Sequence, residues 1–405
     1  MDKIHIYIIE YTGQASLYGI GTYIDELIDI LDEKLYKIVR ITLNVTPDIK
    51  IPQIRKCSYI QIPWITTNRS EIDKYYSRSV AFFLKSIIPN SQKIVFHFNY
   101  LADEYLAYWI KELFPSCLTV LTVHYNEWSI KYKGDLNEFI KNRNQNTNDN
   151  KDITELEIEV SKRMMKYCDK IICASLNSRN ILRKIYHIAP LKIHFIPHAL
   201  KDSHMPKLIY QAQKKYKQLL EKNYKIILFV GRIQERKGII ELIKAFKIVE
   251  KKYPHVILVI AGSGRYDLVT SNPDYVWTKT YFTGMLNHHE LDLLYSIADI
   301  GVFCSYYEEF GYVAVEMMMH NLPIIATRTS GINEIIQNGY NGLLIPFRKK
   351  NGVKTISERV LAKNINFLLS NINHAKCLAK NGRITYLKKY NKQTYKLKMD
   401  SIYIE

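Results

Sequence analysis

The second half of the chain contains the segment Ile300-Gly-Val-Phe-Cys-Ser-Tyr-Tyr-Glu-Glu-Phe-Gly-Tyr-Val-Ala-Val-Glu316. Residues 300–304 are almost wholly apolar, which predicts a buried strand, and residues 313–319 predict a helix with a strong apolar face. Gly311 then lies at the strand-to-helix turn, where free N–H groups and the positive end of the helix dipole suit a phosphate. Glu308 falls on the loop and Glu316 one turn inside the helix, so both carboxylates can face one crevice. An ordinary corner with two solvated glutamates is the alternative explanation.

A second strand, loop and helix begin the same half of the chain. Residues 225–230 (Lys-Ile-Ile-Leu-Phe-Val) predict a short buried strand, and residues 239–249 predict an amphipathic helix. In the loop between them, Gly231 permits a tight turn, while Arg232 and Lys237 supply a planar fork and a point charge for a pyrophosphate. A lone Gly-Arg could be explained by ordinary surface cations. That explanation fits less well when this strand, loop and helix are followed by the second such segment at residues 300–319.

These segments together resemble a known family. The likeness rests on Gly-Arg-x4-Lys-Gly at 231–238, on Glu308-x7-Glu316, and on Gly331-Ile-x-Glu334-Ile-Ile-x-x-Gly339-x-x-Gly342-Leu-Leu. These motifs look like those of the retaining, nucleotide-sugar-dependent glycosyltransferases of the GT4 type. The likeness is dense over residues 226–346 and weaker elsewhere. It implies an α/β protein with the GT-B fold, in which two Rossmann-like parallel-sheet domains face each other across a cleft.

The resemblance also implies a role for each candidate residue. Arg232 and Lys237 would stabilise the departing diphosphate, where negative charge grows in the transition state. Glu316 would bind the ribose, and Glu308 would bind hydroxyls of the donor sugar. The remaining donor-binding candidates in this half are Gly231, Phe310 and Gly311.

The first half holds the acceptor side in this family. Residues 118–123 predict a buried strand that leads into His124, at the carboxyl edge of a parallel sheet, where ligands of doubly wound folds bind. His124 resembles the histidine of the family's Thr-x-His, which reaches the donor sugar, although a purely structural histidine is the alternative. Gly19 and Gly21 resemble the family's paired glycines in the loop before the first helix, which is predicted over residues 22–31.

Departures from the family pattern affect the expected sugar and base contacts. Glu309 stands where a small residue is common before Phe-Gly, and it adds a negative charge beside the expected diphosphate. Pro197-His198-Ala199 replaces the family's Pro-Asn-Gly, and its Gly-x-Gly loop is Gly262-Ser263-Gly264. None of these changes removes a charge that the implied mechanism requires.

Strand and helix patterns alternate along the chain, as expected for parallel α/β sheets. Short apolar strands are predicted at 4–9, 93–98, 118–123, 170–174, 192–196, 225–230, 256–261, 300–304, 322–326 and 343–345. A linker is expected over residues 198–223. The predicted domains are residues 1–200 and residues 201–390, with a helix at about 391–405 that packs back on the first domain.

The composition is that of a globular protein. Its 405 residues are 47% hydrophobic and 24% charged, which suffices for two separate cores. The six cysteines are scattered without metal-type spacing, which fits a reducing compartment. The first apolar stretch is too short for a signal segment, and none approaches the roughly 20 apolar residues of a membrane span. We therefore expect a cytoplasmic protein.

The net charge of +18 is uneven, because residues 348–405 hold 14 Lys/Arg against 3 Asp/Glu. A basic tail of this kind can contact an anionic membrane surface, which would place the protein at the inner membrane face. The general richness in Lys, Asn, Ile and Tyr offers a simpler explanation. No nucleic-acid-binding motif accompanies the charge, so nucleic acid is not expected as a partner.

The sequence thus predicts a retaining glycosyltransferase that moves a sugar from a nucleoside-diphosphate sugar to an acceptor hydroxyl in glycan or glycoconjugate biosynthesis. The acceptor is left open among glycans, lipid-linked molecules, peptides and small molecules. The sequence contains no Asp-x-Asp, and cationic side chains can replace a metal, so we expect neither an obligatory divalent ion nor a cofactor. The alternatives are a phosphorylase or sugar-nucleotide epimerase of the same fold, or a non-catalytic nucleotide-sugar-binding partner.

Overall fold

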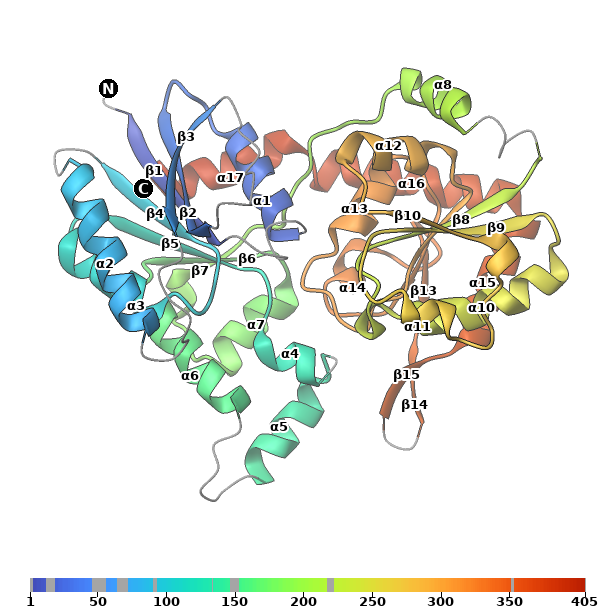
Figure 1. The fold of residues 1–405 in the computed structure, drawn as a ribbon, viewed down its shortest axis with the longest axis horizontal. Helices are drawn as coiled ribbons and strands as arrows, with labels where there is room; N and C mark the ends of the chain where they lie inside the picture. The colour runs from blue at the N-terminus through green and yellow to red at the C-terminus, as the bar shows by residue number, and fades with distance from the viewer. Residues whose placement is uncertain are drawn as a thin grey trace. The chain divides into compact units, whose positions relative to one another are not determined.

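A computed structural model of the chain describes residues 3–11, 19–45, 56–63, 72–89, 93–132, 134–145, 153–216, 222–350 and 353–404. The described residues form two compact α/β units (Figure 1). Unit 1 comprises Met1–Trp128, Phe139–Ala199 and Lys392–Glu405. Unit 2 comprises Ser129–Glu138 and Leu200–Asn391. None of the described helices is long and apolar enough to cross a membrane.

Unit 1 is built on a parallel sheet whose described strands follow the order β3-β2-β1-β4-β5-β6-β7. The strands are β1 (Ile4–Tyr11), β2 (Tyr36–Val45), β3 (Cys57–Pro63), β4 (Ile94–Phe98), β5 (Leu118–Val123), β6 (Lys170–Cys173) and β7 (Ile193–Phe195). The central strands are buried on both faces, as expected of a parallel sheet covered by helices on both sides. The strand order reverses between β1 and β4, which makes their carboxyl ends a position where ligands bind in such folds.

The helices of unit 1 are α1 (Gly19–Ile30), α2 (Ile72–Ile87), α3 (Glu104–Leu113), α6 (Ile153–Lys166), α7 (Leu176–Lys184) and α17 (Lys392–Ile404), with the short η1 (Pro190–Lys192). Two helices, α4 (Glu127–Lys131) and α5 (Leu136–Gln145), cross the boundaries between the units. The apolar side of α1 is wholly buried, with Ile24, Leu27 and Ile28 at 0% exposure. Burial of such a stripe against the sheet is the main stabilisation of a helix this short.

The last helix, α17, joins the sheet of unit 1 through hydrogen bonds and burial. The Tyr36 hydroxyl donates to Asp400 Oδ1 at 2.8 Å, and the Tyr403 hydroxyl lies 2.5 Å from His97 Nδ1. Tyr403 is fully buried. A terminal segment that is tied down in this way is part of the folded unit and does not fray as a free tail.

Unit 2 has a parallel sheet whose strands, in the part of the chain that the structure describes, follow the order β10-β9-β8-β11-β12-β13. They are β8 (Lys225–Val230), β9 (Val256–Ala261), β10 (Thr280–Gly284), β11 (Ile300–Phe303), β12 (Ile324–Thr327) and β13 (Leu343–Ile345). Strands β14 (Phe347–Lys350) and β15 (Val353–Ile356) pair separately and antiparallel. The core of unit 2 is aliphatic, and Ile227, Leu258 and Val302 are completely buried in it.

The helices of unit 2 are α8 (Pro206–Lys215), α10 (Ile239–Lys252), α11 (Asp267–Thr270), α12 (His288–Ile297), α13 (Tyr312–Met319), α14 (Ile332–Ile335), α15 (Glu358–Ser370) and α16 (Ile372–Lys389), with the short η2 (Glu235–Lys237) and η3 (Trp277–Lys279). Two of them follow a glycine with positive φ, since Gly238 precedes α10 and Gly311 precedes α13. These helix starts carry the predicted motifs.

The prediction of parallel α/β architecture is confirmed, but strands β2, β3, β10, β14 and β15 were missed. In β2 the apolar pattern is interrupted by Arg40, which is nevertheless buried because its Nε donates to Glu10 Oε1 at 2.7 Å. A buried charge needs such a partner, and the partner is thirty positions away in the sequence. Strands β3 and β10 lie at the edges of their sheets and are only partly buried, so neither carries a continuous apolar run.

The segment predicted as a linker contains a helix. Within residues 198–223, α8 packs against α12 through Leu208, Ala212 and Leu293, which are all buried. The start of α8 is set by Pro206 at its first position, where a missing N–H costs nothing. Residues 217–221 of the same segment lie outside the described residues.

Candidate active site

The two predicted motifs of unit 2 follow neighbouring strands. β8 and β11 pair in parallel, with Ile227 opposite Ile300. The strand order reverses between them, because β9 and β10 lie beyond β8 while β12 and β13 lie beyond β11. Loops 231–238 and 304–311 therefore both leave the carboxyl edge at the switch point, where open α/β sheets bind ligands.

An ion pair joins the two loops, since Lys237 Nζ donates a hydrogen bond to Glu308 Oε1. The two side chains are only 18% and 15% exposed, so water shields their attraction incompletely. Beside this pair, the Tyr306 amide donates to the Arg236 carbonyl at 2.9 Å. The cation predicted for the diphosphate and the carboxylate predicted for the sugar are thus in direct contact.

Gly238 permits the close approach of these loops. Its φ is 67°, and a β-carbon there would lie 2.1 Å from the Cys304 carbonyl oxygen. The Cys304 thiol in turn donates to the Gly238 carbonyl at 3.2 Å. Any side chain at this position would push the loop that carries Lys237 away from β11, so the glycine sets the geometry of the Lys237–Glu308 pair.

The loop after β12 supports the Glu308 loop from its other side. The Gly331 amide and the Ser330 hydroxyl both donate to the Glu308 carbonyl, at 3.1 and 3.0 Å. A β-carbon at Gly331 would lie 2.4 Å from the Glu309 carbonyl oxygen. Three consecutive strands of the sheet, β8, β11 and β12, thus contribute to one rigid group of loops.

Gly311 starts α13 in the left-handed region, with φ of 102°. This left-handed conformation favours glycine, and a β-carbon there would lie 2.5 Å from Ile332 Cδ1, so the end of that side chain would have to shift. In the described structure no side chain caps this helix start, which leaves it suited to an anion. Phe310 is buried, and its ring packs edge-on against Tyr312 and Tyr390 at 5.2 and 5.8 Å. Its ring therefore holds the loop from inside unit 2.

Arg232 lies on a loop that packs backbone to backbone against the loop after β9. Gly231 and Gly262 have φ of 146° and 145°, and a β-carbon at Gly262 would lie 2.0 Å from the Gly231 carbonyl oxygen. The Ile233 amide donates to the Ser263 carbonyl at 2.9 Å. The Gly-Ser-Gly loop noted in the sequence thus fixes the course of the half-buried Arg232 segment.

Glu316 lies on α13 and is half-buried. Its Oε2 accepts a hydrogen bond of 2.6 Å from the Tyr295 hydroxyl of α12. Burial raises the pKa of the Glu316 carboxyl, and the bond from Tyr295 opposes that rise. Among the described residues no hydrogen bond joins Glu316 to Lys237 or Glu308. The two predicted carboxylates therefore occupy separate points on α13 and its preceding loop.

His124 of unit 1 follows β5, as predicted. Its Nε2 lies 3.1 Å from Asn99 Oδ1, and Asn99 Nδ2 donates to the Ile9 carbonyl at 3.0 Å. Because the Asn99 amide nitrogen donates to the Ile9 carbonyl, the Asn99 amide oxygen is the atom that faces His124 and accepts from it. We therefore assign the proton of His124 to Nε2. Burial lowers the pKa of His124 to about 3, which keeps the imidazole neutral near pH 7.

Other rings surround His124. The Tyr23 ring lies 4.6 Å from His124 and 4.7 Å from His198, between centroids. The Tyr23 hydroxyl is 2.8 Å from Thr122 Oγ1, and His97 Nε2 is 2.7 Å from the same oxygen. Burial lowers the pKa values of His97 and His198 as well, with the pKa of His97 at about 3. The edge of this sheet thus gathers neutral imidazoles and hydroxyls.

Gly19 and Gly21 lie in the first turn of α1, so the prediction that this helix starts at residue 22 was wrong. Glycine is a poor helix former, but burial of the neighbouring apolar residues overrides that weak preference. Residues 12–18, which precede this helix in the sequence, lie outside the described residues. The donor contact expected of the two glycines stays a prediction.

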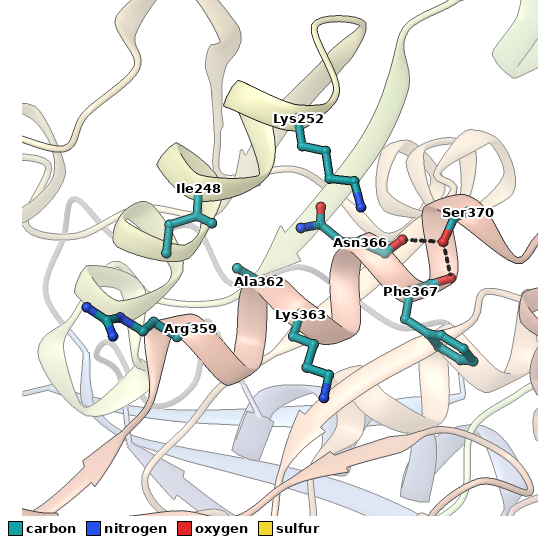
Figure 2. A pocket seen from close by; sticks show the side chains of 8 residues that line it. All are labelled: Ile248, Lys252, Arg359, Ala362, Lys363, Asn366, Phe367 and Ser370. Carbon is teal, nitrogen blue, oxygen red and sulfur yellow. Dashed lines mark hydrogen bonds between the residues drawn. The ribbon is translucent and has the colours of Figure 1, made fainter.

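A cavity of about 390 Å³ lies elsewhere in unit 2, between α10 and α15 (Figure 2). Its lining includes Lys252, Arg359 and Lys363, but Figure 2 shows the last two side chains extending in different directions. None of the predicted site residues lines it, and its cations do not converge on one point, so we do not assign it to the active site. Among the described residues, no three His, Cys, Asp or Glu side chains form a metal-binding group.

Two residues that contact the predicted site residues, Asn99 and Tyr295, were not predicted from the sequence. Asn99 follows the buried strand β4 just as His124 follows β5, so a polar residue after an apolar run was a usable signal. Tyr295 had no such signal, because it occupies an ordinary apolar position of an amphipathic helix.

The fold defines a two-unit α/β protein whose second unit carries the predicted motifs on loops at one edge of its sheet. Two family models match this chain, Glycosyltransferase Family 4 over residues 18–203 and Glycosyl transferases group 1 over residues 211–385. Together they cover most of both units. The chain therefore belongs to the group 1, family 4 glycosyltransferases, which confirms the resemblance seen in the sequence.

Known proteins agree with this assignment. The chain is 30% identical over 195 residues to a capsular polysaccharide biosynthesis glycosyltransferase of Staphylococcus aureus, a stretch that is 48% of this chain and 49% of that protein. The match thus spans about half the length of this curated relative.

Solved structures show the same fold along the whole chain. A sucrose-phosphate synthase of Thermosynechococcus elongatus superposes with a TM-score of 0.77 at 21% identity, covering 99% of this chain and 98% of that one. Anabaena HepE, solved in complex with UDP and glucose, gives a TM-score of 0.73 at 15% identity, covering 98% of both chains. At such identities the likeness establishes the fold alone, and it confirms the GT-B architecture.

Proposed function

We propose that this glycosyltransferase moves a sugar from a nucleoside-diphosphate sugar to an acceptor hydroxyl with retention of the anomeric configuration. The observation that carries the proposal is the Lys237–Glu308 pair beside the start of α13, at the β8/β11 switch point. A cation for the leaving group and a carboxylate for sugar hydroxyls stand one hydrogen bond apart. The complex of the similarly folded Anabaena protein with UDP and glucose supports this class of donor.

The chemistry assigned to unit 2 is stabilisation of the leaving group. As the bond between the sugar carbon and the diphosphate oxygen breaks, negative charge grows on the diphosphate, and Lys237 and Arg232 supply positive charge there. The Lys237 ammonium has three donors, so it can contact a phosphate oxygen while it keeps its bond to Glu308. The first N–H groups of α13 add a favourable dipole.

The remaining assignments concern orientation of the donor. Glu308 binds sugar hydroxyls, and Glu316 binds the ribose. His124, neutral and bonded to Asn99, contributes a hydrogen-bonding group to the sugar from unit 1. Gly231, Gly311 and Phe310 shape the loops around the donor, and Gly19 and Gly21 are assigned to the same ligand.

We further propose that transfer requires no divalent ion and no cofactor. Cationic side chains and a helix start take the part that a metal plays in other nucleotide-sugar enzymes. Dialysis against EDTA is expected to leave the transfer rate unchanged, and Mg²⁺ or Mn²⁺ is expected to add nothing. Loss of activity on chelation, with recovery on adding either metal, contradicts this assignment.

The donor is identified by a screen of nucleotide sugars for thermal stabilisation, because a ligand that binds only the folded state raises the melting temperature. Turnover is then followed with the stabilising donor and a panel of glycan, lipid-linked and peptide acceptors. NMR of the product is expected to show the anomeric configuration of the donor. An inverted product would contradict retention while leaving the transferase assignment intact.

The same assay separates the alternatives. Release of a sugar phosphate with inorganic phosphate as acceptor indicates a phosphorylase, and isomerisation of the donor without an acceptor indicates an epimerase. Donor binding without any turnover indicates a non-catalytic partner. We favour the transferase because all the charged residues of the proposed mechanism are present, on the loops after β8 and β11 and on the helix α13 that follows.

We place the protein in the cytoplasm, with a peripheral contact to an anionic inner-membrane surface through its basic C-terminal residues. The net positive charge of residues 348–405 supports this contact. No nucleic acid is proposed as a partner.

A further inference from the structure

Tyr295 lies beside the carboxylate that we assign to the ribose. Its hydroxyl donates to Glu316 Oε2 at 2.6 Å, and its side chain is 2% exposed. The two residues come from different helices, α12 and α13, so their contact depends on the packing of unit 2. Burial raises the pKa of the Tyr295 hydroxyl well above its usual value, so this group stays protonated and acts as the donor.

The ring of Tyr295 is itself held in place by a second layer. It stacks on the His320 ring with 5.3 Å between centroids and 19° between planes. His320 Nε2 donates to Asp292 Oδ1 at 2.8 Å, since a carboxylate can only accept. The Ser203 hydroxyl donates to the same oxygen at 2.9 Å. The stack and these hydrogen bonds give the Tyr295 hydroxyl a fixed position.

The contact leaves the two oxygens of Glu316 in different states. Oε2 receives the Tyr295 hydroxyl, whereas Oε1 accepts no hydrogen bond within the part of the chain that the structure describes. A carboxylate has about four lone-pair positions, so a single bond of this kind fixes its plane and leaves acceptor capacity for a ligand. A vicinal diol, with two hydroxyl donors on adjacent carbons, matches that capacity.

We propose that Tyr295 is a positioning residue for ribose recognition, because its hydroxyl orients the Glu316 carboxylate to accept the 2′- and 3′-hydroxyls of a ribonucleoside diphosphate. The inference rests on the proposed function, in which Glu316 binds the ribose. It adds that the preference for ribose over deoxyribose depends on a residue that does not touch the nucleotide.

A pH dependence accompanies this arrangement. The groups that act on the Glu316 carboxyl are Tyr295, Asp292 and His288 of α12 and His320, which directly follows α13. Burial raises its pKa most, Asp292 raises it further, and the other three lower it. Tyr295→Phe removes one lowering contribution, so the pKa of Glu316 rises. Since the ionised carboxylate is the acceptor, nucleotide binding by the variant is lost at a higher pH than in the wild type as the pH falls.

Calorimetric titration of the full chain tests the inference. UDP, GDP and ADP are compared first, and the tightest of them is then compared with its 2′-deoxy form. Tyr295→Phe is expected to weaken the ribonucleotide roughly tenfold, the effect of losing a hydrogen bond to a charged group, and to change the deoxynucleotide much less. Tyr386→Phe is the matched control, because Tyr386 is also buried in unit 2 and its hydroxyl donates to the Leu200 carbonyl at 3.0 Å.

The outcomes separate this inference from the proposed function. If Glu316→Ala binds the ribonucleotide as tightly as the wild type, the ribose assignment is wrong and the positioning role is lost with it. If Glu316→Ala loses the ribose preference while Tyr295→Phe keeps both preference and pH profile, the positioning role alone is wrong. If Tyr295→Phe does not fold, Asp292→Asn is used instead, because it weakens the hydrogen bond that holds the His320 ring against the intact tyrosine. This variant is expected to reduce the preference for ribose. An unchanged preference contradicts the inference.

Discussion

The strand-end edges of the two units are built by different means. In unit 2 the loops touch through backbone at glycines, as where Gly238 meets the Cys304 carbonyl and Gly331 meets that of Glu309. In unit 1 the corresponding edge is organised by side chains, with His124 bonded to Asn99. The first construction depends on the absence of side chains at short, fixed spacings. The second depends on partners that are remote in the sequence.

The two edges also handle charge differently. Unit 2 presents the Lys237–Glu308 ion pair, whereas unit 1 presents histidines whose pKa values burial holds far below 7. In the proposed mechanism the charged edge meets the diphosphate, where charge develops, and the neutral edge meets sugar hydroxyls. The comparison teaches that a shared sheet topology does not impose a shared chemistry.

The largest effect is expected from the charged edge. Lys237→Ala and Arg232→Ala should each lower the rate of transfer by about 10² or more, since losing one preorganised stabilising group costs roughly 3 kcal/mol of transition-state stabilisation. Single-turnover kinetics with saturating donor measures this. Lys244→Ala, at an exposed position of α10, is the matched control. Near-normal turnover of both site variants would remove the diphosphate assignment and with it the contrast between the edges.

The next effect tests whether glycine contacts hold the loops of unit 2. Gly238→Ala should destabilise the protein by about 3 kcal/mol, because it adds backbone strain and a steric clash with Cys304. Gly339→Ala is the control, since its φ of 78° is similar but its β-carbon would have no atom within 4 Å. It should cost only about 1 kcal/mol, the left-handed strain itself. Equal losses in urea unfolding would show that the close approach of the loops does not matter.

A smaller effect concerns the neutral edge. The pKa of His97 falls from 6.5 to about 3 on folding, so the unfolded chain binds the proton more readily. The stability contributed by the neutral ring is fully present above about pH 6.5 and is lost as the pH falls towards 3, by up to about 1.4 kcal/mol per pH unit. His97→Gln should flatten the fall in melting temperature between pH 7 and pH 5. His255→Gln, at an exposed position, should not.

The smallest effect is expected from the basic tail. Lys396 pairs with Asp400 at 2.7 Å, Lys392 pairs with Asp29, and Arg383 pairs with Asp202 at 2.6 Å, so part of the positive charge is balanced by the protein itself. Binding to anionic vesicles should be weak, at about 1 kcal/mol per nearby cation, and screened within roughly 8 Å at physiological salt. Sedimentation at low and high salt, with Lys388→Glu and neutral vesicles for comparison, measures it. Equal pelleting with both lipids contradicts the contact.

The sequence by itself determined the class of fold and most of the charged edge. Strands such as β8, β9 and β5 are short apolar runs, and burial on both faces of a parallel sheet demands such runs whatever the rest of the chain does. Gly311 was predicted at the strand-to-helix turn, and the structure places it there with a left-handed φ of 102° that favours glycine. These features depend on burial and backbone conformation at neighbouring residues, so they can be recognised in short stretches of sequence.

Only the tertiary structure decided which residues pair with each other through hydrogen bonds and ion pairs. Arg40 is buried in β2 because Glu10 of β1 neutralises it, and His97 is bonded to Tyr403, which is 306 positions away. Tyr295 reaches Glu316 because α12 and α13 pack in one unit, although its own sequence position shows only an apolar helical pattern. A hydrogen bond or ion pair between distant residues has energy only when the fold brings both partners together, so neither partner alone carries its signal.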